Sequence, residues 1–303
     1  MGKAKFQMIR LLVPEQNSIG IFAGGDASGL VNVIDTINTA ILSNVTDFGD
    51  LAFINAFLSA CGSSTRGVIG GGENYLTQPV NTIQYITFAS AGNTQNFGNL
   101  TQARWGLAAC ASSTRGLFGG GYPGTGQSNV IDYITIASTG NAADFGDLTV
   151  ARIYIASGAS QTRGVWAGGI SLQNTIDFIE IATASNASDF GDLSQGAHWF
   201  SCASSPTIGV FCGSRGSTPP QDPGRLDYIT WATTGNATDW GSLVSKSNVR
   251  TGTMACSSAT RAVIADQYSI DYVQFAAGGE CSNFGDLSVA RIDGTGTSNA
   301  KWA

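Results

Sequence analysis

The chain repeats one sequence unit along its whole length, and this repeat is the strongest constraint on its fold. Its most visible part is a box of Asp or Asn, an aromatic residue, Gly, one variable residue and Leu. The aromatic residue of the box, spaced 44 to 50 residues apart, recurs at Phe48, Phe97, Phe145, Phe190, Trp240 and Phe284. Six copies of one unit predict a repeat architecture in which neighbouring units share their core.

Each unit has room for about four short strands. Segments of five to seven residues, rich in β-branched and aromatic types and bounded by Gly, Asn and Ser, occupy positions such as 131–136 and 164–169, and a segment rich in small residues occupies 151–160. No stretch shows sustained helical spacing. Four strands about every 47 residues are typical of the blade of a β-propeller. The sequence therefore predicts an all-β, six-bladed propeller with four antiparallel strands per blade.

The two ends of the repeat region complement each other. Residues 19–25 read like the second strand of a unit with no first strand before it, and residues 290–300 read like a first strand with no second strand after it. We expect the C-terminal strand to pair with the N-terminal strands and so to close the ring. This predicts one propeller domain over residues 17–303, with residues 1–16 outside the repeat.

The repeat resembles the kelch repeat. The second strand ends in Gly-Gly at Gly71-Gly72, Gly120-Gly121 and Gly168-Gly169. An aromatic residue follows in the third strand, at Tyr85, Tyr133, Phe178, Tyr228 and Tyr272. The Trp position of kelch is mostly Phe here, and its Arg appears as Arg104, Arg152, Arg250 and Arg291, with Asn55 and His198 near that position in two other units. This resemblance implies a kelch-like fold, and it says little about function.

The unit is also similar to repeat-built structural proteins of tailed bacteriophages, especially marine and cyanobacterial phages. Three phrases carry the likeness, at residues 130–137, 140–148 and 162–165, and variants of each recur along the chain. The resemblance implies a virion protein, in the tail, a tail fibre or a related appendage, which is assembled in the host cytoplasm and has other virion proteins as partners. A capsid decoration protein without a receptor role is the alternative.

Composition and charge exclude several classes of partner. The net charge is −6, the chain has only 15 Lys and Arg residues, and the calculated isoelectric point is about 4.6. Affinity for duplex nucleic acid depends on Lys and Arg, so we expect no nucleic acid partner. No run approaches the ~20 apolar residues needed to span a bilayer, and the apolar run near the N-terminus is too short for a signal peptide, so we expect no membrane insertion.

Residues 1–16 are the candidate docking arm. This segment carries two of the four Lys residues of the chain. Its apolar side chains, which a partner could cover, are Phe6, Met8, Ile9, Leu11 and Leu12. If the chain is a decoration protein, we expect this arm to attach it to the particle.

Carboxylates in the box could bind calcium, which prefers several oxygen ligands. Asp144 with Asp147 is one such pair, and Asp189 with Asp192 is another, but half of the boxes lack the pair. Asx side chains also close turns, so the favoured interpretation is that residues such as Asp144 and Asn96 cap a turn, that Gly146 permits it, and that the aromatic ring is buried between blades. The sequence thus predicts no metal site and no cofactor.

No catalytic residue stands out. The six cysteines fall mostly among small residues of the first strands and are expected to be buried free thiols. The single histidine, His198, is expected to replace the Arg of its unit. The arginines of the Thr-Arg turns, Arg66, Arg115, Arg163 and Arg261, are expected to bond carbonyls of their own turns rather than to form a charged ring. A carbohydrate-active enzyme is the less favoured alternative, because a ligand set of Tyr and paired His is missing.

The connections between second and third strands differ most from unit to unit and should lie on one face of the ring. Residues that packing does not require are candidates for binding. The candidates, which offer aromatic faces and polar groups, are Tyr75, Gln78, Tyr122, Gln127, Arg215, Gln221 and Tyr268. This face is a candidate for binding a host-surface polysaccharide or a neighbouring virion protein, and the alternative that the loops vary without a binding role stays open.

Overall fold

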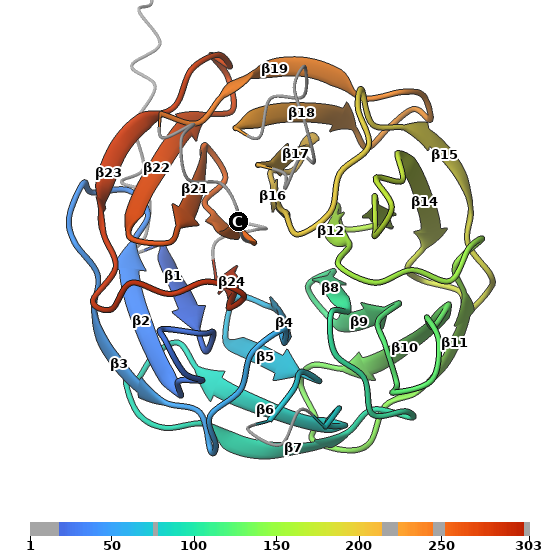
Figure 1. The fold of residues 1–303 in the computed structure, drawn as a ribbon, viewed down its shortest axis with the longest axis horizontal. Coiled ribbons are helices and arrows are strands. Elements are labelled where there is room, and N and C mark those ends of the chain that lie inside the picture. Colours follow the sequence, from blue (N-terminus) through green and yellow to red (C-terminus); the bar gives the residue numbers. More distant parts are fainter. Residues whose placement is uncertain (1–17, 75–77, 214–223, 245–251, 300–303) are drawn as a thin grey trace, which may run out of the picture.

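Six four-stranded antiparallel sheets stand around a central channel in the computed structural model (Figure 1). The structure describes residues 18–74, 78–213, 224–244 and 252–299. This arrangement confirms the predicted six-bladed β-propeller. We name the strands of each blade A to D from the channel outward. Within the described ranges, no helix is long and apolar enough to cross a membrane.

The blades follow the chain order around the ring. Blade 1 contains β24 (Thr295–Ser298), β1 (Ile19–Ala23), β2 (Val33–Asn38) and β3 (Thr46–Asp50). Blade 2 contains β4 (Ser59–Gly62), β5 (Arg66–Gly70), β6 (Thr82–Thr87) and β7 (Gln95–Asn99). Blade 3 contains β8 (Ala108–Ala111), β9 (Arg115–Gly119), β10 (Val130–Thr135) and β11 (Ala143–Asp147).

The second half of the ring repeats this pattern. Blade 4 contains β12 (Ala156–Ala159), β13 (Arg163–Ala167), β14 (Thr175–Glu180) and β15 (Ser188–Asp192). Blade 5 contains β16 (Ser201–Ser204), β17 (Ile208–Cys212), β18 (Arg225–Thr230) and β19 (Thr238–Ser242). Blade 6 contains β20 (Met254–Ser257), β21 (Arg261–Asp266), β22 (Ser269–Gln274) and β23 (Ser282–Asp286).

The predicted closure of the ring is confirmed. β24 pairs with β1 in antiparallel register, from Gly20 opposite Ser298 to Ala23 opposite Thr295. The Ile19 amide also donates to Asn299 Oδ1. The end of the chain therefore supplies the innermost strand of the blade that the beginning of the chain starts.

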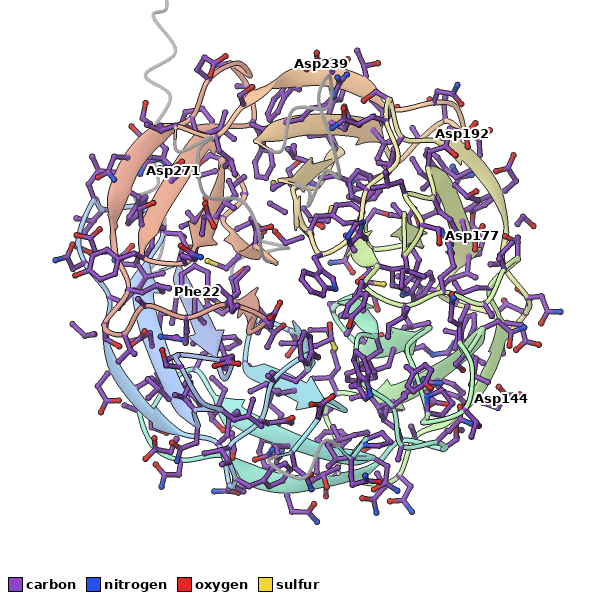
Figure 2. All side chains as sticks on the ribbon, in the orientation of Figure 1. Phe22, Asp144, Asp177, Asp192, Asp239 and Asp271 are labelled. Atoms are coloured by element: carbon purple, nitrogen blue, oxygen red, sulfur yellow. The ribbon has the colours of Figure 1, made fainter. Side chains whose placement is uncertain are left out.

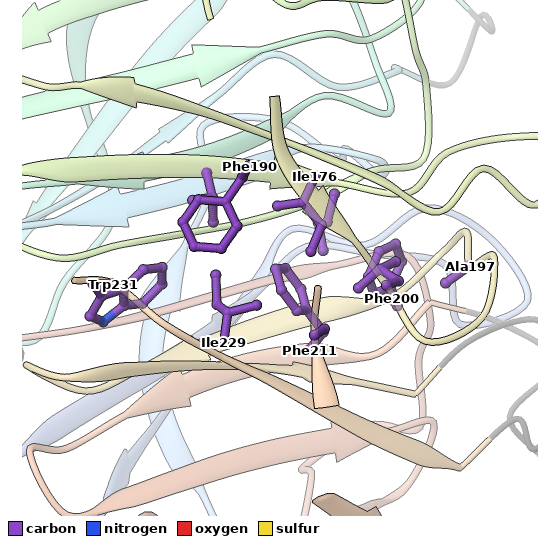
Figure 3. Packing of buried hydrophobic residues seen from close by; sticks show 12 residues of the cluster. Ile176, Phe190, Ala197, Phe200, Phe211, Ile229 and Trp231 are labelled. Atoms are coloured by element: carbon purple, nitrogen blue, oxygen red, sulfur yellow. The ribbon is translucent and has the colours of Figure 1, made fainter. Parts of the chain in front are cut away.

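The hydrophobic core is divided among the six seams between blades. The cluster between blades 4 and 5 shows the pattern, with Ile176 and Phe190 of blade 4 facing Phe211, Ile229 and Trp231 of blade 5 (Figure 3). Five further clusters fill the other seams. Each blade therefore buries both of its faces, which explains why the third strands are apolar on both sides.

The box lies in the outermost strand, and the predicted capped turn is wrong. Asp144, Phe145 and Gly146 all belong to β11, where the pairing with β10 shifts register next to Gly146. Asp144 is exposed at the rim of the ring (Figure 2), and the Phe145 ring is buried between blades as expected. A Cβ at Gly146 would collide with the Ser185 carbonyl oxygen of the next blade, so Gly is needed for close approach of two backbones.

This close approach forms a belt of hydrogen bonds around the ring. The amide of Gly140 donates to the Phe97 carbonyl of the preceding blade at 2.8 Å, and the Ala142 amide donates to the Asn99 carbonyl. The Asn99 amide in turn donates to Asn141 Oδ1. Equivalent bonds join the other seams, so the outer strand of each blade is tied to the C–D turn of the next blade.

A buried carboxylate in the third strand ties down the D–A connection. Asp132 accepts from Thr101 and from the Arg104 guanidinium at 3.0 Å, and both charged side chains are fully buried. Arg152 with Asp177 and Arg291 with Asp35 repeat this pair. Burial lowers the pKa of Arg104 and of Arg152, and the paired carboxylate opposes that shift. Blade 2 uses neutral residues instead, with Asn55 and Gln84 in the same two positions.

Phe145→Ala should lower the free energy of unfolding by about 3–5 kcal/mol, because it leaves a cavity at a filled seam. Chemical denaturation of the purified variant measures this change. A loss below about 1 kcal/mol would show that the ring does not fill the seam.

Arg104→Asn and Asp132→Gln should each destabilise the fold by about 3–5 kcal/mol, because each leaves an unpaired buried charge. The double variant copies the neutral arrangement of blade 2, so it should lose less than the sum of the two single variants, as a double-mutant cycle measures. Additive losses would contradict the pairing.

Candidate functional site

One face of the ring carries both the B–C loops and the D–A loops, because antiparallel strands bring these two connections to the same end of each blade. Trp105 of a D–A loop and Tyr122 of a B–C loop show the contact, since each donates its amide to the other's carbonyl. Ala56 with Glu73 and Ile292 with Asp26 pair in the same way. We call this end the loop face.

The D–A loops join one another around the mouth of the channel. The Phe57 amide donates to the Asp293 carbonyl, Gly106 donates to Phe57, Tyr154 to Gly106 and Trp199 to Tyr154, at 2.8 to 3.0 Å. These five residues all have φ between 53° and 65°, in the left-handed region. A left-handed conformation is unfavourable for a bulky side chain, and the hydrogen bonds between blades hold it in place.

Five half-buried aromatic side chains gather at this mouth, and we call them the aromatic platform. The members, in the order of the chain, are Phe57, Trp105, Tyr122, Tyr154 and Trp199. The ring centroids of Tyr154 and Trp199 are 4.7 Å apart, and those of Trp105 and Tyr122 are 5.4 Å apart. Phe57 contacts Trp199 at 6.4 Å, although the two residues come from D–A loops on opposite sides of the ring. The platform therefore covers the centre of the loop face.

The fold does not require these aromatic residues. Gly106 takes the same left-handed position in blade 3, and Asp293 takes it in blade 1, with the same pattern of hydrogen bonds. The backbone conformation is easiest for Gly, so three large aromatic side chains at this position are a cost to stability. Costly residues that the scaffold does not need are typical of a functional site.

A small cavity lies in the channel next to the platform. Its volume is about 110 Å³, and its lining includes Phe57, Tyr154 and Trp199 together with the small polar residues Ser59, Ser157, Ser201, Thr253 and Thr295. This volume holds a few water molecules. A larger ligand would therefore contact the outer side of the platform rather than enter the channel.

Carboxylates flank the platform on one side. Asp26 and Glu73 lie in the B–C loops of blades 1 and 2, and Asp293 lines the cavity. Burial raises the pKa of Glu73. In the tight B–C turn of blade 6, burial and the nearby Asp271 raise the pKa of Asp266 to about 6.

The structure brings only part of the predicted loop-face set together. Tyr122 belongs to the platform, whereas Gln78, Gln127 and Tyr268 are exposed on other parts of their B–C loops. Tyr75, Arg215 and Gln221 lie outside the described residues, as do the arm residues Phe6, Met8, Ile9, Leu11 and Leu12.

The sequence analysis missed four platform residues, Phe57, Trp105, Tyr154 and Trp199. They follow the box in the D–A loops, whereas the candidates from the sequence all come from the variable B–C loops. Aligning the six units by their Leu and Gly positions would have shown Phe, Gly, Tyr, Trp, Gly and Asp at one position. That variation is the signal that could have found the site.

Two expectations about basic residues are corrected. Ala197, not His198, takes the Arg position, because the Gly169 amide donates to the Ala197 carbonyl as Gly121 donates to Arg152.

The turn arginines bond carbonyls of the next blade rather than of their own turns. Arg66 donates to the carbonyls of Ile136 and Ala137, and its guanidinium stacks on Tyr85 at 4.7 Å.

The six cysteines, all of which the structure describes, form no disulfide, as expected, and five of them are buried. Cys61, Cys110, Cys202 and Cys256 lie in A strands, and a Cβ at Gly116 would meet the Cys61 sulfur of the preceding blade. Burial raises the pKa of Cys212 and, with Asp271 and Glu280, raises the pKa of Cys281 to about 12. These two thiols stay protonated at neutral pH and are poor nucleophiles.

The described residues contain no group of three or more His, Cys, Asp and Glu side chains that could hold a metal ion.

No protein-family model matches the chain, and no curated protein matches it. The fold and the geometry of the platform therefore carry the functional argument.

Trp199→Gly should change the free energy of unfolding by no more than about 1–2 kcal/mol, well below the loss expected for Phe145→Ala. The variant loses ring contacts but relieves an unfavourable backbone conformation that Gly accepts. Thermal and chemical denaturation measure the effect. A loss as large as that of Phe145→Ala would mean that the platform is part of the structural core.

Asp266→Asn should stabilise the protein at neutral pH and have little effect near pH 4. The folded-state pKa of about 6 exceeds the ordinary value of 3.8, so folding favours the protonated form. Wild-type stability should therefore fall as pH rises from about 4 to 6, by an amount on the order of 2 kcal/mol, and the Asn variant should lack this fall. Melting temperatures of both proteins across that range provide the measurement, and parallel profiles would contradict the assignment.

Proposed function

We propose that the chain is a non-enzymatic binding protein of a tailed-phage virion, which recognises its ligand through the aromatic platform. The observation that supports binding is the platform itself, because aromatic side chains occupy left-handed positions that Gly fills in a neighbouring blade. The virion assignment rests on the resemblance of the repeated phrases to phage structural proteins. A propeller with rigid seams and a variable face suits the display of a binding surface on a particle.

Exposed or half-exposed aromatic groups at the centre of a face are typical of recognition surfaces, where Trp and Tyr contribute large contact areas at little entropic cost. The platform joins residues of blades 2 to 5, so a ligand would contact several D–A loops at once. Non-covalent binding by this route requires no nucleophile, metal ion or cofactor.

Binding of the purified, labelled protein to cells of the phage host tests the proposal. Wild-type protein should bind saturably, and the variant Phe57→Gly/Trp199→Gly should lose at least about tenfold in affinity, since central aromatic anchors dominate such interfaces. The matched control is Leu42→Ala, an exposed apolar side chain in a C–D turn on the opposite face, which should bind like the wild type.

Antibodies against the chain should also label purified phage particles. Labelled particles combined with no binding of folded protein to cells would favour a decoration protein. Unlabelled particles would contradict the virion assignment.

A further inference from the structure

We infer that the aromatic platform binds an uncharged saccharide and discriminates against acidic polysaccharides. This inference rests on the proposed function and adds the chemical class of the ligand. Three features of the loop face support it: the division of the site into an aromatic side and a carboxylate side, the engagement of the described arginines, and the spacing of the carboxylates.

The site has two chemically different sides. On the side of blades 3 to 5, the D–A and B–C loops present Trp105, Tyr122, Tyr154, Ile170 and Trp199. On the side of blades 1 and 2, the same structural positions hold Asp26, Glu73 and Asp293. Phe57 donates its amide to the Asp293 carbonyl in the row of hydrogen bonds between D–A loops, and its ring completes the aromatic surface.

This division fits a sugar ring. A pyranose presents C–H groups on its faces, which the electron-rich faces of aromatic rings attract, and hydroxyl donors around its edge. Carboxylates accept hydrogen bonds from such hydroxyls, and charge-assisted bonds of this kind are strong. A ligand lying across the platform could therefore stack on the aromatic side and donate to Asp26 and Glu73, whereas the buried Asp293 lines the channel cavity beneath.

The arginines that the structure describes are all committed to protein partners. Three of them are fully buried against Asp35, Asp132 and Asp177. Four others donate to carbonyls at the opposite face of the ring, and Arg225 pairs with Asp227 and Asp239. Among the described residues, Asp26 and Glu73 lie beside the platform, and Arg225, which begins β18 at this end of blade 5, is paired with Asp227 and Asp239. A uronate or sulfate group on the platform would therefore meet repulsion.

The carboxylates are also distributed rather than grouped. Asp26, Glu73 and Asp293 belong to three different loops, and the described residues form no cluster that would hold a single metal ion. Carboxylates that are spread over several loops match the hydroxyl groups around a sugar ring, whereas a concentrated positive charge would be matched better by grouped carboxylates. This arrangement favours a neutral saccharide over a basic peptide.

A printed array of purified oligosaccharides provides the test. It should contain neutral hexose and N-acetylhexosamine oligomers, uronic-acid oligomers and sulfated oligomers, and a Lys-Arg peptide should be titrated separately. We expect binding to one or more neutral oligomers, with an affinity that changes less than about threefold between low and high salt, because no ion pair forms. Trp105→Ala and Trp199→Gly should each weaken the best neutral ligand at least about tenfold, and Leu42→Ala should not.

The outcomes separate the two proposals. Binding of acidic oligomers alone, or of the basic peptide alone, would overturn the inference about ligand class while leaving a recognition role intact. Binding to host cells without binding to any oligosaccharide would also overturn it and point to a protein receptor. If neither cells nor oligosaccharides bind to folded protein, both the inference and the proposed recognition function fail.

Discussion

A buried polar contact in each blade organises the passage from one blade to the next. The third strand places Asp132 where it accepts from Thr101 at the end of the preceding outer strand and from Arg104 in the D–A loop. Because this carboxylate holds Thr101 and Arg104, it fixes the first half of the D–A loop on its way to the channel mouth. The left-handed backbone, the row of amide-to-carbonyl bonds between D–A loops and the aromatic platform all follow this part of the loop.

The repeats also serve as internal controls that a single-copy fold does not offer. Blade 2 keeps the connection without charges, because Gln84 accepts from the Ala52 amide and Asn55 donates to the Gly71 carbonyl. Gly106 adopts the same left-handed backbone conformation at the channel mouth without any side chain. Comparison of equivalent positions therefore distinguishes what the scaffold needs from what the chain adds to it.

Most of the architecture could be predicted from the sequence because packing imposes it six times. The box spacing predicted the number of blades, and the unmatched end segments predicted the pairing of β1 with β24. The role of Gly146 could not be predicted, because its neighbour Ser185 belongs to another blade and is distant in sequence. Variation at one aligned position could have pointed to the platform residues, but not to their contact, since Phe57 and Trp199 meet only across the closed ring.

The pairing of β1 with β24 has a consequence for how the chain can fold. Asp35 and Arg291, which form the buried pair of blade 1, are separated by 256 positions, so this blade cannot be completed until the strands of the other five blades have been synthesised. Until then the inner edge of β1 lacks its partner strand, and unpaired edges invite association with other chains. Closure of so long a loop also adds an entropic barrier late in folding. Blades 2 to 6 are each continuous in sequence and can form in order as they emerge, which leaves the final strand to convert an open, association-prone arc into a closed ring.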